Sequence, residues 1–361
     1  MTYLIPKLPL KIDLETKTIL KKLINAKSAL MKLDGVSNII PNKEILINTL
    51  SLQEAKNSSL VENIITTDED LFKSNSFENE FSTIESKEVY LYADALKKGY
   101  QLVKKHQLLT NNYIKEIQRI LKQSDGNFRK GSGTNLTNDR TGEIIYSPPQ
   151  DYNQILNLMD NLEKFINDDS ISDLDPLIKM AIIHHQFESI HPFPDGNGRT
   201  GRIINVLYLV KHNLLETPIL YLSRYINDHK NEYYRLLQAV RDDLTLESWE
   251  NWVLYMLKGI EETSLQSITV IEKIKDLMQS HKNKMKKELP KIYSQDLLNA
   301  TFNYPYTTTS ILERELKKSR VTINKYLDEL CNIDLATKIK KGRENYYINT
   351  DLVTLLCNIN K

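Results

Sequence analysis

The chain has 361 residues, of which 40% are hydrophobic and 26% are charged, and these values are typical of a folded globular protein rather than a disordered one. Its length exceeds the roughly 250–300 residues at which a single hydrophobic core stops growing, so we expect two or three domains. The 48 basic and 47 acidic residues leave a net charge of +1, which argues against a chain built throughout to coat nucleic acid.

The two cysteines, Cys331 and Cys357, both lie near the C-terminus, which excludes a disulfide framework and a four-cysteine zinc site. No run of 18 apolar residues occurs, and the opening residues MTYLIPKLPLKID hold too short an apolar stretch for a signal peptide. The sequence therefore predicts a soluble cytoplasmic protein in a reducing compartment, with no membrane as a partner.

Apolar residues at helical spacing run through most of the chain and predict a mainly α-helical protein. The first helix is expected to begin after Asp13, a good N-cap, and to stop at Asp34-Gly35. The same spacing predicts further helices over 43–52, 58–64, 86–106, 111–123, 151–167, 175–190, 197–213, 223–242 and 246–262. Strands are scarce in this pattern, and no βαβ alternation is present.

The segment 126–149 differs from its surroundings because it carries four glycines, two prolines at its end and few apolar residues. It predicts a short β-hairpin with its turn at 139–142. Loops of this length inside a helical protein tend to be functional or disordered.

The last seventy residues change character. A lysine-rich stretch over 279–291 predicts a linker or an exposed helix end. Three short helical patterns then precede two strands around Gly342, an order that favours a winged helix over 291–361.

The residues 319–325 are a candidate recognition helix of this winged helix, with Lys338, Lys340, Lys341 and Arg343 on its wing, and such a domain can bind DNA. The region holds eleven basic and eight acidic residues. This small excess favours protein contacts or packing over DNA.

One segment carries most of the chemistry: residues 191–202, HPFPDGNGRTGR. Two prolines stop the helix that ends at Ile190, and the turn Asp195–Gly198 contains residues that tolerate positive φ. A helix begins directly after the turn. Free backbone N–H groups at such a helix start form an anion site.

The charged residues of this segment fit a bound nucleotide. Arg199 and Arg202 share a face of the first helical turn, where cations are unfavourable unless an anion neutralises them. Asp195 is suited to hold Mg²⁺ together with phosphate oxygens, and His191 is the ordinary general base of the segment. The segment therefore predicts transfer of a phosphate-containing group. Its glycines also spell G-x-G-x-x-G, but the dinucleotide reading requires a preceding strand and the pattern there is helical.

The segment resembles the Fic motif, H-x-F-x-[DE]-G-N-G-R-x-x-R, at all eight specified positions. The resemblance extends over roughly residues 5–262. It implies a mainly α fold: an all-helical Fic core with a short β-hairpin flap, plus the small C-terminal winged helix. The expected divisions are an N-terminal helical region with an inhibitory helix, the Fic catalytic core, a linker helix and the winged helix, over 1–105, 106–262, 263–290 and 291–361.

What the resemblance implies is a protein adenylyltransferase that moves AMP from ATP, with Mg²⁺ as cofactor, to a Ser, Thr or Tyr hydroxyl of a target protein or of the chain itself. His191 would deprotonate the hydroxyl, Phe193 would anchor the loop, Asp195 would hold Mg²⁺, and the flap would align a target segment by strand addition. The implied ATP contacts are Gly196, Asn197, Gly198, Arg199, Thr200, Gly201, Arg202, Tyr233 and Tyr234, with Arg202 toward the γ-phosphate and the tyrosines on the adenosine side.

Residues 58–63, SSLVEN, are similar to the inhibitory motif of this family, [ST]-x-x-x-E-[GN], with Ser58, Glu62 and Asn63 at its specified positions. The resemblance implies that Glu62 pairs with Arg202 and removes the partner of the γ-phosphate. The same residues also fit removal of AMP from modified targets, with Glu62 positioning water. A third interpretation is a DNA-binding regulator whose Fic core senses a nucleotide. A homo-oligomer is a further candidate partner.

Overall fold

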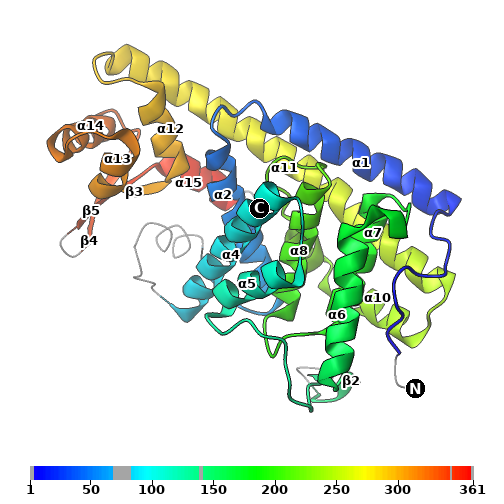
Figure 1. Cartoon of the computed structure of the whole chain (residues 1–361). Helices are drawn as coiled ribbons and strands as arrows, with labels where there is room; N and C mark the ends of the chain where they lie inside the picture. Colours follow the sequence, from blue (N-terminus) through cyan, green and yellow to red (C-terminus); the bar gives the residue numbers. More distant parts are fainter. Residues whose placement is uncertain (1–3, 68–82, 138–140, 342–343, 359–361) are drawn as a thin grey trace.

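The computed structural model describes residues 4–67, 83–137, 141–341 and 344–358. Two long helices frame the molecule: α1 (Lys17–Ser37) lies along α11 (Leu246–Glu288), which runs from the core to the C-terminal domain (Figure 1). An ion pair of 2.5 Å joins Lys22 to Glu261 between them. None of the described helices is long and apolar enough to cross a membrane.

At the centre lies α7 (Pro176–Ile190), in which every residue after Pro176 is buried. Its sequence is apolar on nearly all sides, which is typical of a helix surrounded by other helices. It packs against α8 (Asn197–Lys211), α6 (Tyr152–Asn167) and α11. The loop between α7 and α8 is therefore held at both ends by the most buried part of the protein.

Shorter helices surround this pair. They are α2 (Lys43–Val61), α4 (Ile84–His106), α5 (Asn111–Lys122), the 3₁₀ turn η1 (Asp169–Ile171), α9 (Leu222–Asp228) and α10 (Lys230–Asp242). Helix α2 contacts α4, α8 and α9, so the C-terminal end of α2 reaches the start of α8.

The predicted hairpin is present as β1 (Leu136–Thr137) and β2 (Ile144–Tyr146), which pair antiparallel. Of its expected turn at 139–142, residues 139 and 140 lie outside the described residues.

The C-terminal domain is a winged helix, as predicted. Its elements are α12 (Gln295–Asn303), β3 (Tyr306–Thr308), α13 (Thr309–Leu316), α14 (Arg320–Asn332), β4 (Thr337–Lys341), β5 (Glu344–Ile348) and α15 (Thr350–Cys357). The sheet order is β3-β5-β4, with both neighbours antiparallel to β5. The sequence analysis missed β3 and α15, which are both short.

Two N-terminal expectations are wrong in detail. Helix α1 begins after Thr16, whose side chain accepts a hydrogen bond from the Ile19 N–H, whereas Asp13 accepts from the Glu15 N–H outside the helix. The expected helices 43–52 and 58–64 are one helix, α2. Its buried face carries polar residues, which conceal the apolar period: Thr49, Ser51, Gln53, Glu54, Asn57, Ser58 and Ser59.

Two later expectations are also corrected. The expected helix 223–242 is divided at His229 (φ −120°, ψ 35°), whose ring contacts the Tyr225 carbonyl oxygen at 3.0 Å. Helix α11 does not end near residue 262 but continues to Glu288, so the lysine-rich stretch is largely the exposed end of this helix.

The contact of α9 with α11 gives a stability prediction. A Cβ on Gly259 of α11 would lie 2.7 Å from the Tyr225 ring and 2.9 Å from the Leu222 side chain, whereas a Cβ on Gly35 of α1 would meet nothing within 4 Å. We expect Gly259→Ala to destabilise by ~1–3 kcal/mol through overpacking, and Gly35→Ala to stabilise by ~0.5–1 kcal/mol through helix propensity. Thermal unfolding of both variants checks this, and equal midpoints would contradict the close packing.

Candidate functional site

The loop between α7 and α8 begins at His191, which caps α7 in the left-handed conformation (φ 49°, ψ 58°). Phe193 follows and is fully buried, with its ring centroid 5.2 Å from that of Phe128 and 6.4 Å from that of Phe187. The aromatic contacts fix the middle of the loop to the core.

Asn197 closes the loop on itself. Its side-chain amide donates to the Phe193 carbonyl oxygen, and its side-chain oxygen accepts from the Phe193 N–H, both at 2.8 Å. The side chain is therefore used by the loop, and the backbone N–H is the part of Asn197 that is suited to the predicted phosphate contact.

Gly196 and Thr200 lie on the same turn. Gly196 has φ 73° and precedes α8 without any side chain capping the helix start. The fully buried Thr200 donates to the side-chain oxygen of Gln118 at 2.6 Å, and the Gln118 amide donates to the Asp195 carbonyl oxygen at 2.6 Å. Helix α5 thus positions the turn through Gln118, and the Thr200 hydroxyl is used in the hydrogen bond to Gln118.

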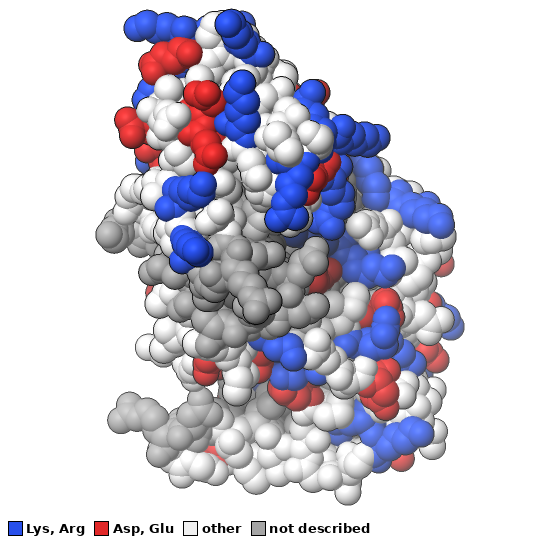
Figure 2. Space-filling model, turned by 90° about the vertical axis from the view of Figure 1, so that its left-hand side faces the viewer, with Lys and Arg blue, Asp and Glu red and all other residues white. Residues whose placement is uncertain are grey.

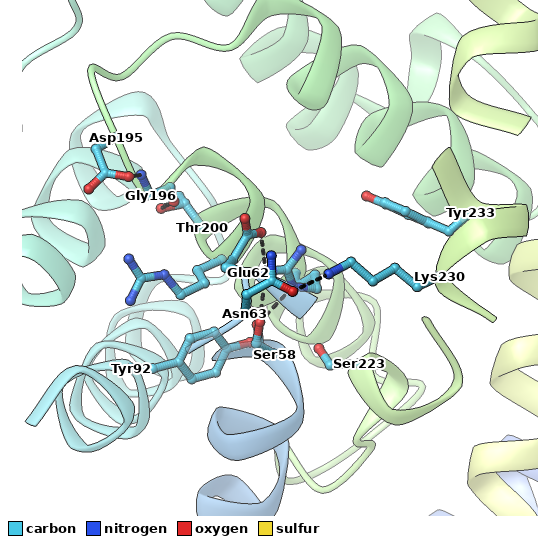
Figure 3. A network of polar contacts seen from close by, with 12 residues as sticks. Ser58, Glu62, Asn63, Tyr92, Asp195, Gly196, Thr200, Ser223, Lys230 and Tyr233 are labelled. Carbon is cyan, nitrogen blue, oxygen red and sulfur yellow. Dashed lines mark hydrogen bonds and ion pairs between the residues drawn. The ribbon is translucent and has the colours of Figure 1, made fainter. Parts of the chain in front are cut away.

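Each motif arginine has a carboxylate partner. Arg199, 3% exposed, donates to Glu88 at 2.6 Å. Arg202, 2% exposed, donates through Nη2 to Glu62 Oε1 at 2.7 Å and through Nε to the Ser58 hydroxyl at 2.8 Å (Figure 3).

Glu62 stands directly over the start of α8. A Cβ on Gly198 would lie 2.3 Å from Glu62 Oε1, so the carboxylate touches the Gly198 backbone. Although burial raises the pKa of Glu62, the Arg202 guanidinium outweighs it and the pKa lies below its usual value. An ionised carboxylate therefore occupies the predicted anion site. The adjacent Asn63 (φ 61°) accepts a hydrogen bond from Lys230 at 2.9 Å.

The two predicted tyrosines are in different environments. Tyr233 is buried and its hydroxyl lies 2.8 Å from His184 Nε2, pointing toward the Glu62 region (Figure 3). The other ring nitrogen of His184, Nδ1, lies 3.0 Å from the Asn205 side-chain amide, so both ring nitrogens have a polar partner. Tyr234 is 45% exposed.

His191 is held as a neutral imidazole. Burial first, and then the cationic Arg241 and Arg129, lower its pKa to about 4. At neutral pH the ring can therefore accept a proton.

Asp195 fits the predicted Mg²⁺ ligand. Its side chain is 68% exposed, and Lys122, 2.7 Å away, outweighs partial burial and holds the pKa of Asp195 below its usual value. Among the described residues, no group of three His, Cys, Asp or Glu side chains could hold a metal by itself. One ionised carboxylate beside an anion site matches the way Mg²⁺ is bound by few protein ligands together with phosphates.

Several side chains of the site were missed. They lie far from the motif in sequence: Glu88, Gln118, Lys122 and Arg129. The one sequence feature that could have indicated any of them is the polar Gln118 among the apolar residues of one face of α5. Glu188 on α7 is a further buried carboxyl, and burial raises its pKa to about 7.

Comparison with known proteins places this loop in a family. The model for the Fic/DOC family matches residues 108–209, the Fic/DOC N-terminal model matches 20–101, and that for the protein adenylyltransferase SoFic-like C-terminal domain matches 277–352. A probable protein adenylyltransferase of Aquifex aeolicus is 39% identical over 83 residues, and protein adenylyltransferase Fic of Drosophila erecta is 31% identical over 85 residues. These alignments cover 23% and 24% of this chain, and 25% and 16% of the respective relatives.

Solved structures share the fold. A Fic family protein from Desulfovibrio desulfuricans G20 superposes with a TM-score of 0.58 at 19% identity, over 94% of this chain and 97% of that one. Fic-1 from C. elegans superposes with a TM-score of 0.53 at 19% identity, over 71% and 73% of the two chains.

The loop geometry predicts a stabilising role for the Asn197 side chain. We expect Asn197→Ala to lower stability by ~1–3 kcal/mol, because it leaves a buried N–H and carbonyl oxygen of Phe193 without partners. Asn157, exposed on α6, is the matched control, and Asn157→Ala is expected to be neutral. Thermal unfolding of the two variants tests this, and equal midpoints would show that the bonds do not stabilise the loop.

Proposed function

The chain belongs to the Fic/DOC family, and on this premise we propose that it is a protein adenylyltransferase that moves AMP from ATP to a Ser, Thr or Tyr hydroxyl of a target protein. The observation that carries the proposal is the loop 191–202. It brings a neutral imidazole, an uncapped helix start and two buried arginines together at one end of α8.

In the proposed reaction, the hydroxyl oxygen bonds to the α-phosphorus of ATP, the bond from that phosphorus to pyrophosphate breaks, and His191 accepts the hydroxyl proton. The N–H groups at the start of α8, with Arg199 and Arg202, bind the phosphates. Asp195 would hold Mg²⁺, which when bound neutralises charge on the phosphate oxygens. Tyr233 is the proposed contact on the adenosine side of the nucleotide.

Glu62 is the inhibitory group in this proposal. Its carboxylate holds Arg202 and touches Gly198, so it competes with phosphate oxygens for both. Ser58 supports the competition because it binds Arg202 from the same helix. ATP then lacks a full set of phosphate contacts until Glu62 moves.

Removal of AMP from modified targets is the alternative that uses the same residues. Its supporting observation is that 35% of the Glu62 side chain remains exposed while the carboxylate stands at the phosphate site, where it could orient water. A DNA-binding regulator has weaker support. On the face that includes the winged helix, Lys and Arg are interspersed with Asp and Glu (Figure 2).

The setting and partners extend the proposal. A reducing cytoplasmic setting fits Cys331 and Cys357, which are not joined in a disulfide. ATP and a hydroxyl-bearing protein are the proposed partners, and the chain itself is a candidate acceptor.

The proposed inhibition by Glu62 predicts that its removal increases activity. We expect Glu62→Gly to raise AMP transfer at least about tenfold, since removing ~1.4 kcal/mol of competition at Arg202 gives that factor. The measurement uses ATP labelled at the α-phosphate, with Mg²⁺, and counts label on protein. Glu272→Ala, which removes an exposed carboxylate from α11, is the control and should leave the rate unchanged.

A second substitution separates the possible outcomes. Label that appears with Glu62→Gly and is lost on adding His191→Ala supports both roles. Equal labelling of wild type and Glu62→Gly refutes the inhibitory role of Glu62. Label removed from premodified protein faster by wild type than by Glu62→Gly would favour removal of AMP as the main activity.

The low pKa of His191 predicts a wide acid range. A base works in its deprotonated form, so the transfer rate should fall only as the pH drops through a value near 4, rather than near the ordinary 6.5. Glu62→Gly lacks a carboxylate that raises the pKa of His191, so its rate at saturating ATP and Mg²⁺ should stay level from pH 8 down to about pH 4. An acid midpoint close to 6.5 would mean that His191 is not the buried neutral base.

A further inference from the structure

Arg129 is a buried arginine outside the Fic motif, in the segment that leads from α5 into the flap. Its guanidinium donates from Nε to the His191 carbonyl oxygen at 2.8 Å, and from Nη2 to the carbonyl oxygens of Ile190 at 3.5 Å and of Pro149. Its own N–H donates to the Pro192 carbonyl oxygen at 2.8 Å. One residue thus contacts four backbone positions.

Two of these positions are the last carbonyl groups of α7. Such groups lack partners within the helix, and a cation beside them is favourable because of the helix dipole. Arg129 satisfies them at the point where His191 adopts its left-handed conformation. The orientation of the His191 ring therefore depends on a backbone that Arg129 holds.

The same guanidinium joins the two ends of the flap. Arg129 stands where the flap leaves α5, and Pro149 stands where the flap returns to α6. A second link lies nearby: the Tyr146 hydroxyl at the end of β2 donates to the Ser189 carbonyl oxygen at 2.8 Å, and Arg241 lies 4.1 Å over the Tyr146 ring. Both ends of the flap are therefore attached to the last turn of α7.

We propose that Arg129 is a positioning residue that couples the flap to His191, so that a target segment docked on the flap meets a correctly oriented base. The inference rests on the proposed function and deepens it, since it says how the target surface and the base are aligned. Arg129 reaches the substrate only through the backbone of residues 190–192 and is not itself catalytic.

Two separable effects follow from the geometry. The first is the fork that aligns three carbonyl groups, which a lysine cannot reproduce. The second is the effect of the Arg129 charge on the pKa of His191. The charged and polar groups that face the ring are Arg241 from α10, Arg129, Glu62 from the end of α2, and the Glu188 carbonyl oxygen of α7. After burial and Arg241, Arg129 is the next cause that lowers the pKa of His191.

The test compares Arg129→Lys and Arg129→Met in the Glu62→Gly background, with transfer of label from α-labelled ATP to the chain as the activity. We expect both to lower the maximal rate about tenfold to a hundredfold, with the half-saturating ATP concentration unchanged, because the base is misplaced while the phosphate site is intact. The acid midpoint should stay in place for Arg129→Lys and move to higher pH for Arg129→Met, which removes the cation.

Arg241→Met is the matched control. It removes the other nearby cation but leaves the carbonyl groups of Ile190 and His191 bound, so it should move the acid midpoint upward with a smaller loss of rate than either Arg129 variant. Thermal unfolding of each protein identifies any variant that does not fold. Arg129→Lys keeps a positive charge at this buried position and so changes only the geometry of its hydrogen bonds.

A readout without catalysis separates this inference from the proposed function. The His191 ring signal is titrated by NMR in each variant and assigned by its loss in His191→Ala. We expect a changed ring signal in both Arg129 variants and an upward titration shift in Arg129→Met alone. Unchanged ring signals, or a full transfer rate in a folded Arg129→Lys, would overturn the inference. If the ring signals change as expected but none of the proteins transfers label, the inference stands and the proposed function is overturned.

Discussion

The structure depends on one electrostatic constraint: Arg202 is buried, charged and close to a helix N-terminus, so it must have an anion beside it. Burial of an unpaired guanidinium is far more costly than its exposure, and the positive end of the α8 dipole adds to the cost. Glu62 meets the requirement in the described chain, and its own lowered pKa and the raised pKa of Arg202 are two expressions of the same pairing. In the proposed reaction, the phosphates of ATP take the place of Glu62 beside Arg202.

The surrounding helices make that exchange local. Helix α7 fixes His191, α5 fixes the turn through Gln118, and α4 supplies Glu88 to Arg199. None of these elements has to move for Glu62 to leave. His191, the start of α8 and Arg199 are thus already positioned, which is the arrangement that the proposed transfer from a phosphate requires.

Sequence reasoning reached the parts of this site that are encoded locally. The loop 191–202 carries its own turn residues, base and cations, and Glu62 was linked to Arg202 through a short motif. The supporting residues could not be found in this way, because Gln118, Glu88 and Arg129 come from helices and loops that only tertiary packing brings to the loop. Helix boundaries were also predicted wrongly: the polar buried face of α2 conceals its period, and the backbone of His229 leaves the helical conformation within a pattern that is continuous.

Glu62 lies at the end of α2, and this position bears on how the proposed inhibitory contact with Arg202 would be released. Two turns before Glu62, the buried Glu54 accepts hydrogen bonds from Tyr92 of α4 and from Ser223 at the start of α9. One turn before Glu62, Ser58 binds Arg202. Glu62 itself is the C-cap, and the next residue, Asn63, leaves the helix in the left-handed conformation. Helix ends open at much lower free energy than buried helix interiors. Unwinding the last turn would therefore free the carboxylate while Glu54 keeps the rest of α2 in place, so the proposed inhibition could be lifted without disturbing the helices that hold His191.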